Sequence, residues 1–102
     1  MSEKDDFIKW LENNTDLSDS SIGKYSGAIN TISRELKNNS IIEGTLYNGY
    51  NLVEVVELKD IYFSVNQFIE KDKRGNRMYS RAFTYYIEFL KYERDRNNSN
   101  KK

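Results

Sequence analysis

The 102-residue sequence contains no cysteine and no histidine. Without cysteine the chain can form no disulfide, no thiolate metal site and no thiol nucleophile. Without histidine it lacks the commonest neutral-pH base and metal ligand. No phosphate-binding glycine loop and no nucleophile paired with a base can be assembled from the remaining residues. We therefore expect a protein without a catalytic centre, a metal or a cofactor, which acts by binding.

Long apolar runs are also absent. The stretch from Met1 to Asp6 is polar and acidic, unlike a secretory signal, which has a basic start and an apolar centre. No later segment approaches the roughly 20 apolar residues that span a bilayer. We therefore expect a soluble, cytoplasmic protein with no membrane partner.

The chain nevertheless has the apolar content of one small folded unit. Hydrophobic residues make up 37% of the sequence and aromatic residues 14%, which excludes a wholly disordered chain despite 31% charged residues. This length supports one modest core. After Glu93 the composition becomes almost entirely polar. We expect a single helical domain over residues 1–96 and a disordered polar tail over residues 97–102.

Apolar residues recur at helical spacing in the first forty residues. They predict a short helix ending near Asn14 and a second helix that begins after Ser18 as its N-cap. The turn-forming residues around Ser40 end this second helix. Gly23 and Gly27 lie four residues apart within it, and we expect them to allow close packing against a neighbouring helix.

The centre of the chain is ambiguous. The β-branched run from Leu52 to Leu58 is compatible with a strand, but a helical face is also satisfied, and we favour the helix. A short turn over residues 66–70 should follow, and then a basic loop over residues 71–77. That predicted helical face consists of Leu52, Val55, Val56, Lys59 and Phe63.

The clearest helix of the chain begins after this loop, where six apolar residues form a stripe at helical spacing. The stripe consists of Tyr79, Ala82, Phe83, Tyr86, Phe89 and Leu90. The fold class that follows is all-α, a compact bundle of four to five helices with short connections. The expected core consists of Trp10, Leu11, Ile22, Tyr25, Ile29, Ile32, Leu36, Phe63, Phe68, Phe83, Tyr86, Phe89 and Leu90.

The charge is unevenly distributed along the chain, although its total is zero. Residues 1–70 contain 6 basic and 12 acidic residues, a net charge of −6, and residues 71–102 contain 10 and 4, a net charge of +6. Such a chain can present a basic face to phosphate despite its neutral total. The paired carboxylates Glu54/Glu57 and Asp5/Asp6 are best explained as a solvated acidic surface.

The basic loop and the start of the last helix form the candidate site. Phosphate recognition requires converging cations, which helix N-terminal amides can assist. Here Asn76 is a possible helix cap, and Tyr85 is a possible stacking surface for a base. The alternative is that the cations solubilise the helix and pair with the acidic half. The candidate contacts are Lys73, Arg74, Asn76, Arg77, Arg81 and Tyr85.

Three segments resemble the small helical N-terminal domain of certain bacterial restriction endonucleases, of the HNH or modification-dependent type. They are residues 7–11, residues 17–29 and residues 75–90, of which Gly75-Asn76-Arg77-Met78-Tyr79-Ser80 is the most specific. More loosely, the pattern is similar to the core-binding domain of tyrosine recombinases. Both resemblances imply a module that faces DNA. No nuclease or recombinase segment is present, so no catalytic activity is implied.

These observations support two hypotheses about function. The first is a non-catalytic module that recognises double-stranded DNA for a restriction-type defence system. The alternative is a phage-encoded anti-CRISPR or anti-restriction inhibitor that binds a CRISPR or restriction nuclease, with its acidic half imitating the DNA backbone. The hypotheses differ in which half of the chain makes the contact, the basic segment after residue 70 or the acidic segment before it.

Overall fold

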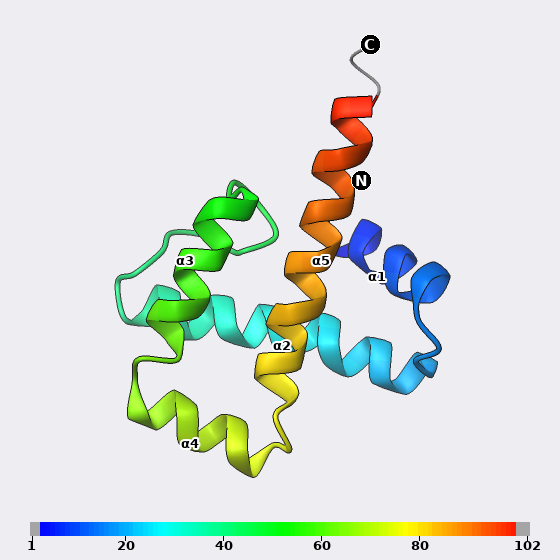
Figure 1. The fold of residues 1–102 in the computed structure, drawn as a ribbon. Coiled ribbons are helices and arrows are strands. Elements are labelled where there is room, and N and C mark those ends of the chain that lie inside the picture. The colour runs from blue at the N-terminus through cyan, green and yellow to red at the C-terminus, as the bar shows by residue number, and fades with distance from the viewer. Residues whose placement is uncertain (1–2, 100–102) are drawn as a thin grey trace.

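The computed structural model describes residues 3–99 and is all-helical in architecture, as the sequence predicts (Figure 1). The described residues form five helices: α1 (Glu3–Asn14), α2 (Asp19–Asn38), α3 (Leu52–Tyr62), α4 (Asn66–Arg74) and α5 (Met78–Ser99). Within this range, every helix is too short or too polar to cross a lipid bilayer.

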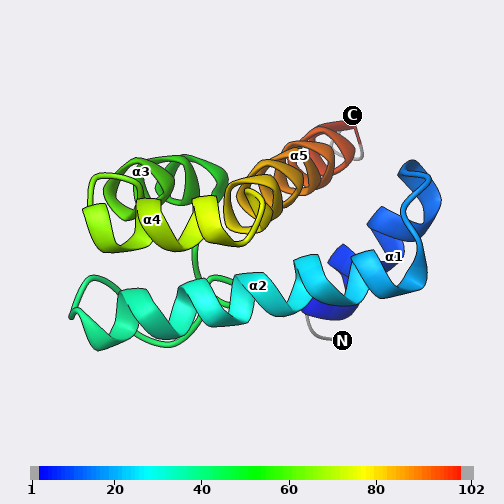
Figure 2. The same ribbon diagram turned by 90° about the horizontal axis from the view of Figure 1, so that it is seen from below.

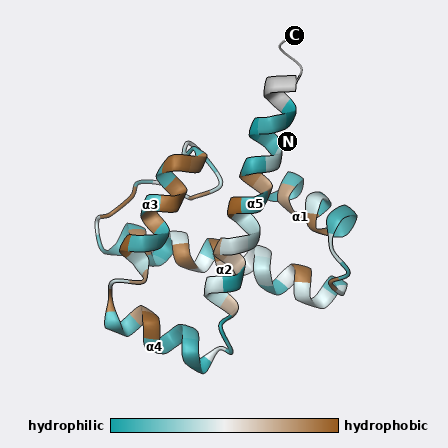
Figure 3. Ribbon diagram, viewed as in Figure 1, coloured by the Kyte–Doolittle hydropathy of each residue, from teal (hydrophilic) through white to brown (hydrophobic). Residues whose placement is uncertain are grey.

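The two long helices, α2 and α5, cross each other and share the most extensive helix–helix contact (Figure 1). Seen from below, α3, α4 and α5 lie on one side of the molecule, and α2 lies on the other with α1 beside its first half (Figure 2). The C-terminal part of α5 extends beyond the other helices (Figure 1), and much of its surface that is coloured in Figure 3 is hydrophilic.

Local sequence signals set the ends of α2 and α3. Ser18 caps α2, and its hydroxyl accepts the amide of Ser21 at 3.2 Å. At the other end Ser40 adopts a left-handed conformation with φ of 60°, so that the Ile41 amide reaches the Leu36 carbonyl at 2.9 Å. Asn51 and Glu54 cap α3 reciprocally. The predicted start and end of the second helix are therefore confirmed.

Residues 52–62 are helical, so the strand alternative is wrong, but the predicted face of this helix is also partly wrong. The buried side chains are Val55, Leu58 and Tyr62, whereas Val56 is 40% exposed. The run contains apolar residues on every side, so its periodicity does not define one buried face. Tyr62, which the prediction left out, is fully buried.

Residues 66–74 form α4 rather than a short turn followed by a loop. Helices this short are marginal alone and depend on tertiary contacts. Phe68 supplies one such contact, because its ring stacks on Tyr62 with centroids 4.4 Å apart and planes 7° apart. Lys73 and Arg74 therefore project from a helix and not from a loop.

Most of the predicted core residues are buried in one hydrophobic core, within which α5 contributes rings to two groups of aromatic contacts. Phe83 contacts Tyr62 in one group, and Tyr86 contacts Phe7 in the other. The prediction placed Trp10, Tyr25 and Phe63 in the core, but they are only partly buried at its edge. The list of expected core residues left out further buried residues, although Val55 and Ala82 were placed on predicted apolar faces. Several of the omitted residues lie in the connection between α2 and α3, and the full set is Phe7, Ala28, Ile42, Leu46, Tyr47, Val55, Leu58, Tyr62, Ala82 and Ile87.

The C-terminal boundary differs from the expected one. Helix α5 continues to Ser99, three residues into the segment 97–102 that was expected to be a disordered tail. Residues 100–102 of that segment lie outside the described residues.

Gly23 and Gly27 do not mediate close packing. A Cβ atom added at either position would meet nothing within 4 Å outside its own helix. The two glycines therefore only weaken α2, since glycine in a helix costs about 1 kcal/mol relative to alanine.

Replacing Gly27 with Ala should stabilise the protein by about 0.5 to 1 kcal/mol, because helix propensity improves without a steric clash. Urea unfolding followed by circular dichroism measures this change. A loss of stability would show that another helix approaches Gly27 closely after all.

The Tyr86 hydroxyl joins α1 to the core and has one proton for two acceptors. It lies 2.8 Å from Glu3 Oε1 and 2.9 Å from the Leu46 carbonyl oxygen. The phenol proton is therefore shared between the Glu3 carboxylate and the Leu46 carbonyl, and neither acceptor receives a full hydrogen bond. Burial, opposed by the bond from Tyr86 and assisted by the negative charges of Glu93 and Asp6, raises the pKa of Glu3.

A raised carboxyl pKa means that Glu3 stabilises the fold most at acid pH, and that this contribution is lost as pH rises through its pKa. Glu3→Gln supplies a permanent donor, so the variant should have a higher melting temperature than wild type at pH 7. The difference should shrink as pH falls toward 3. The matched control is the exposed Glu12→Gln on the same helix, for which no such difference is expected. A destabilised Glu3→Gln variant at pH 7 would contradict this reading.

Candidate nucleic-acid interface

Five of the six candidate site residues, four cations and one asparagine, lie around the turn that joins α4 to α5. Lys73 and Arg74 are in the last turn of α4, Asn76 and Arg77 are in the connection, and Arg81 is in the first turn of α5. All five side chains are exposed. The structure thus brings together five of the six predicted site residues on consecutive turns of the chain.

Asn76 ends α4 and does not cap α5, so the capping role expected from the sequence is wrong. The Arg77 amide donates to the Asp72 carbonyl at 2.7 Å and the Asn76 amide to the Lys73 carbonyl at 3.2 Å. This pair of bonds is the Schellman motif, which places a residue of positive φ after the helix. Asn76 has φ of 56°, and asparagine tolerates that conformation better than most residues.

Asp72, in the last turns of α4, is the residue that caps α5. Its Oδ1 accepts the Ser80 amide at 2.9 Å, and the residue is only 3% exposed. The positive end of a helix dipole favours this carboxylate. The Ser80 amide, one of the amides at the N-terminus of this helix, is therefore already occupied. This amide cannot serve an anion, so we attribute anion binding at this turn mainly to the side-chain cations.

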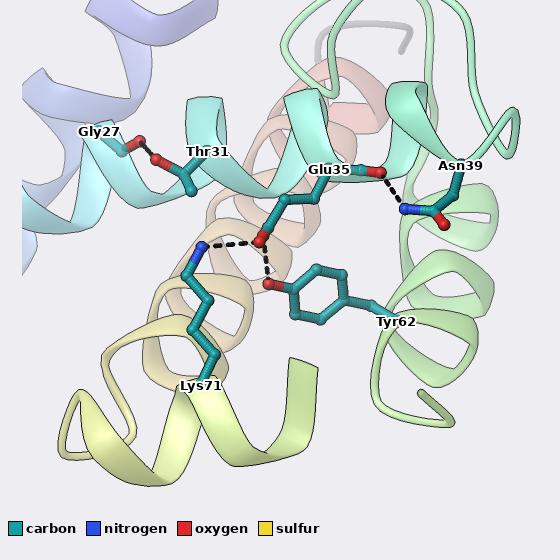
Figure 4. A network of polar contacts seen from close by, with 6 residues as sticks. All are labelled: Gly27, Thr31, Glu35, Asn39, Tyr62 and Lys71. Atoms are coloured by element: carbon teal, nitrogen blue, oxygen red, sulfur yellow. Dashed lines mark hydrogen bonds and ion pairs between the residues drawn. The ribbon is translucent and has the colours of Figure 1, made fainter. Parts of the chain in front are cut away.

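The position of α4 depends on Glu35 in α2 (Figure 4). Lys71 Nζ lies 2.6 Å from Glu35 Oε2, and the Tyr62 hydroxyl donates to Glu35 Oε1 at 2.6 Å. Burial, and then the bond to this carboxylate, raise the pKa of the Tyr62 phenol, which therefore remains a donor. The Lys71 ammonium also lies 5.0 Å from the centre of the Tyr79 ring.

Lys71 is thus paired with the acidic half of the chain, as the alternative interpretation of the basic segment predicts. The other cations of this segment have no comparable internal ion pair among the described residues. Lys73 lies 3.9 Å from Glu70, and both side chains are more than half exposed, so this contact contributes little. Across residues 3–99, no carboxylate forms an ion pair with Arg74, Arg77 or Arg81. These three guanidinium groups remain available to a ligand.

A shallow depression beside the turn adds residues from α2. It is lined by Ser21, Lys24, Tyr25, Gly75, Asn76, Met78 and Arg81. Lys24 is exposed and lies about fifty residues from the basic segment in sequence, and it was missed for that reason. Only the crossing of α2 and α5 reveals that Lys24 and Arg81 line the same depression.

Tyr85, predicted as a stacking surface, is half-buried and packs against Tyr25, with ring centroids 5.3 Å apart. Tyr25 lines the depression, whereas Tyr85 does not. The aromatic ring presented at the depression is therefore Tyr25, with Tyr85 in contact with it.

Arg77 has φ of 66°, directly after the positive φ of Asn76. A non-glycine residue in the left-handed region costs about 1 to 2 kcal/mol. Backbone strain of this kind is found disproportionately at functional sites. Here it holds the Arg77 side chain on the outside of the turn, where it is exposed.

The described residues contain no group of three or more histidine, cysteine, aspartate or glutamate residues placed to hold a metal ion. Comparison with protein-family models, with curated proteins and with solved structures found no match. The interpretation of the site therefore rests on its own geometry and charge.

Arg77→Gly should be more stable than Arg77→Ala by about 1 kcal/mol, because only glycine adopts positive φ without a Cβ penalty. Both substitutions remove the same cation, so the difference isolates the backbone. Chemical unfolding of the two variants measures it. Equal stabilities would mean that residue 77 is not held at positive φ in solution.

Proposed function

We propose that this chain is a non-catalytic module that binds double-stranded DNA through the α4–α5 turn. The single observation that carries the proposal is the set of three exposed arginines around this turn, Arg74, Arg77 and Arg81. None of them forms an ion pair within residues 3–99, and Arg81 lines the same depression as Lys24. Side-chain cations that converge on one surface are what phosphate contacts require. A role in a restriction-type system rests on the sequence resemblance alone.

The arrangement favours the DNA backbone over a base as the main ligand. The cations come from α2, α4, α5 and the α4–α5 connection, so they do not follow a single helix face, and two of them, Lys24 and Arg81, line the depression. Arginine binds phosphate through two parallel N–H donors, so its charge and its geometry both suit this ligand. The ring of Tyr25 adds a surface for a sugar or a base beside them.

DNA affinity should fall steeply with salt, because each neutralised phosphate releases condensed counterion. The three arginines and Lys24 predict a slope of log K against log salt of about −3 to −4, at about −0.9 per contact. Fluorescence anisotropy with a short labelled duplex, from low to physiological salt, measures this slope. A slope near zero would contradict binding through these cations.

Single substitutions locate the contacts. Arg81→Ala and Lys24→Ala should each reduce the slope by about one unit. Lys91→Ala is the matched control, because it removes an exposed cation from the same helix, away from the turn, and should leave the slope unchanged. Arg77→Gly and Arg77→Ala should weaken binding equally although their stabilities differ.

The alternative, inhibition of a CRISPR or restriction nuclease, predicts a different pattern. Wild type would then show no DNA binding even at low salt, and it would form a complex with a purified nuclease. Charge reversal in the acidic half would abolish that complex, because complementary potentials steer such interfaces. That combination of results would replace the proposal.

A further inference from the structure

Helix α3 exposes an unusual concentration of apolar side chains. Among the described residues, four large hydrophobic side chains are exposed, and three of them lie on this helix. Val53 is 64% exposed, Val56 40% and Ile61 42%. The spacings of three and five residues place all three on the side of α3 away from Val55 and Tyr62. Figure 3 shows the apolar character of the first turns of α3.

The same side of α3 is acidic. Glu54, Glu57 and Asp60 are exposed between the apolar residues, and none of them forms an ion pair within residues 3–99. Glu54 accepts the Asn51 amide through one oxygen at 3.0 Å, which leaves its other oxygen to solvent. Lys59, the one basic residue of the helix, is partly buried at its flank.

A shallow groove runs beside this face, between α3 and the connection that precedes it. It is lined by Ile41, Ile42, Tyr50, Glu54, Glu57, Leu58 and Ile61. The Tyr50 hydroxyl holds the far wall, because it bonds both the amide and the carbonyl of Glu43 at 3.1 Å. The groove therefore has an apolar floor, two carboxylates at its rim and a wall fixed by hydrogen bonds.

We propose that this face of α3 and its groove form a second binding surface, which takes a basic amphipathic helix of a protein partner. Apolar side chains at helical spacing would contact Ile61 in the groove and Val53 and Val56 on the adjoining surface of α3. Lysine or arginine residues flanking them would meet Glu57 and Asp60. Helix-in-groove recognition combines such apolar anchors with peripheral charge pairs.

The negative charge of this face favours a basic partner helix over nucleic acid, a lipid surface or a second copy of the chain. Three carboxylates repel nucleic acid and anionic lipid, and helices that lie on membranes carry lysine and arginine on the polar face instead. A symmetric pairing of two α3 helices would place like charges together, which disfavours a second copy of the chain. The surface is also separate from the α4–α5 turn, so it does not depend on DNA binding.

The test uses the full chain, labelled with ¹⁵N, and a synthetic peptide with a leucine face flanked by lysines at helical spacing. A peptide of the same composition in scrambled order is the control for charge alone. Amide shifts should concentrate in residues 41–62 with the amphipathic peptide, and the scrambled peptide should bind at least tenfold more weakly. Equal binding of both peptides, no binding, or shifts spread over every acidic surface would overturn the proposal.

Substitutions on the exposed face of α3 separate the apolar contribution to peptide binding from the charged contribution, and they leave the core unchanged. Val53→Ser should weaken peptide binding at least fivefold, whereas Tyr92→Ser, which removes an exposed aromatic side chain from α5, should not. Glu57→Lys with Asp60→Lys should weaken it at least tenfold and transfer preference to a peptide with glutamates in place of lysines. Light scattering that detects a wild-type dimer, lost in Val53→Ser, would instead assign the face to a second copy.

Discussion

The carboxylate of Glu35 is the contact on which the arrangement of α3 and α4 against α2 depends. It projects from α2 and holds α3 through the Tyr62 hydroxyl and α4 through the Lys71 ammonium, both at 2.6 Å (Figure 4). The side chain of Glu35 is 19% exposed, so this ion pair is better shielded than a surface pair. Phe68 can stack on Tyr62 only when α3 and α4 keep this relation. The orientation of the basic turn therefore follows from one residue of α2, far away in sequence.

Contacts inside this arrangement of helices determine which charged groups are exposed at the α4–α5 turn. Asp72 is used inside the fold as a cap, Lys71 is neutralised by Glu35, and the backbone reverses through two successive left-handed residues. Arg74, Arg77 and Arg81 remain on the outside and form no ion pair with any residue that the structure describes. This distribution of charge is consistent with an anionic ligand, because Lys71 is the only cation of residues 71–81 with a partly buried ion pair in the part of the chain that the structure describes, and Lys73 has only an exposed contact with Glu70. The acidic charge left over is exposed mainly elsewhere, including on α3.

Sequence patterns predicted the helices whose ends or apolar faces are encoded locally. They failed where contacts between residues distant in sequence determine the structure. The Ser18 cap and the apolar stripe of the last helix were sufficient to place α2 and α5. The helical state of Lys71 to Arg74 was missed because α4 is short and is stabilised by residues of α2 and α3. The burial of Leu46, in a connection rich in turn residues, was missed for the same reason. The candidate site was predicted as a cluster along the chain, but its Lys24 component arises from helix crossing, which periodicity does not encode.

The central claim is that the α4–α5 turn with Lys24 is the surface that meets DNA. A titration of the ¹⁵N-labelled chain with a short duplex at low salt tests it most directly, since every amide reports its own environment. The account predicts shifts concentrated in residues 21–25 and 72–81, with α3 unaffected. Shifts confined to α1 and α3, or none at DNA concentrations well above those of the protein, would contradict it.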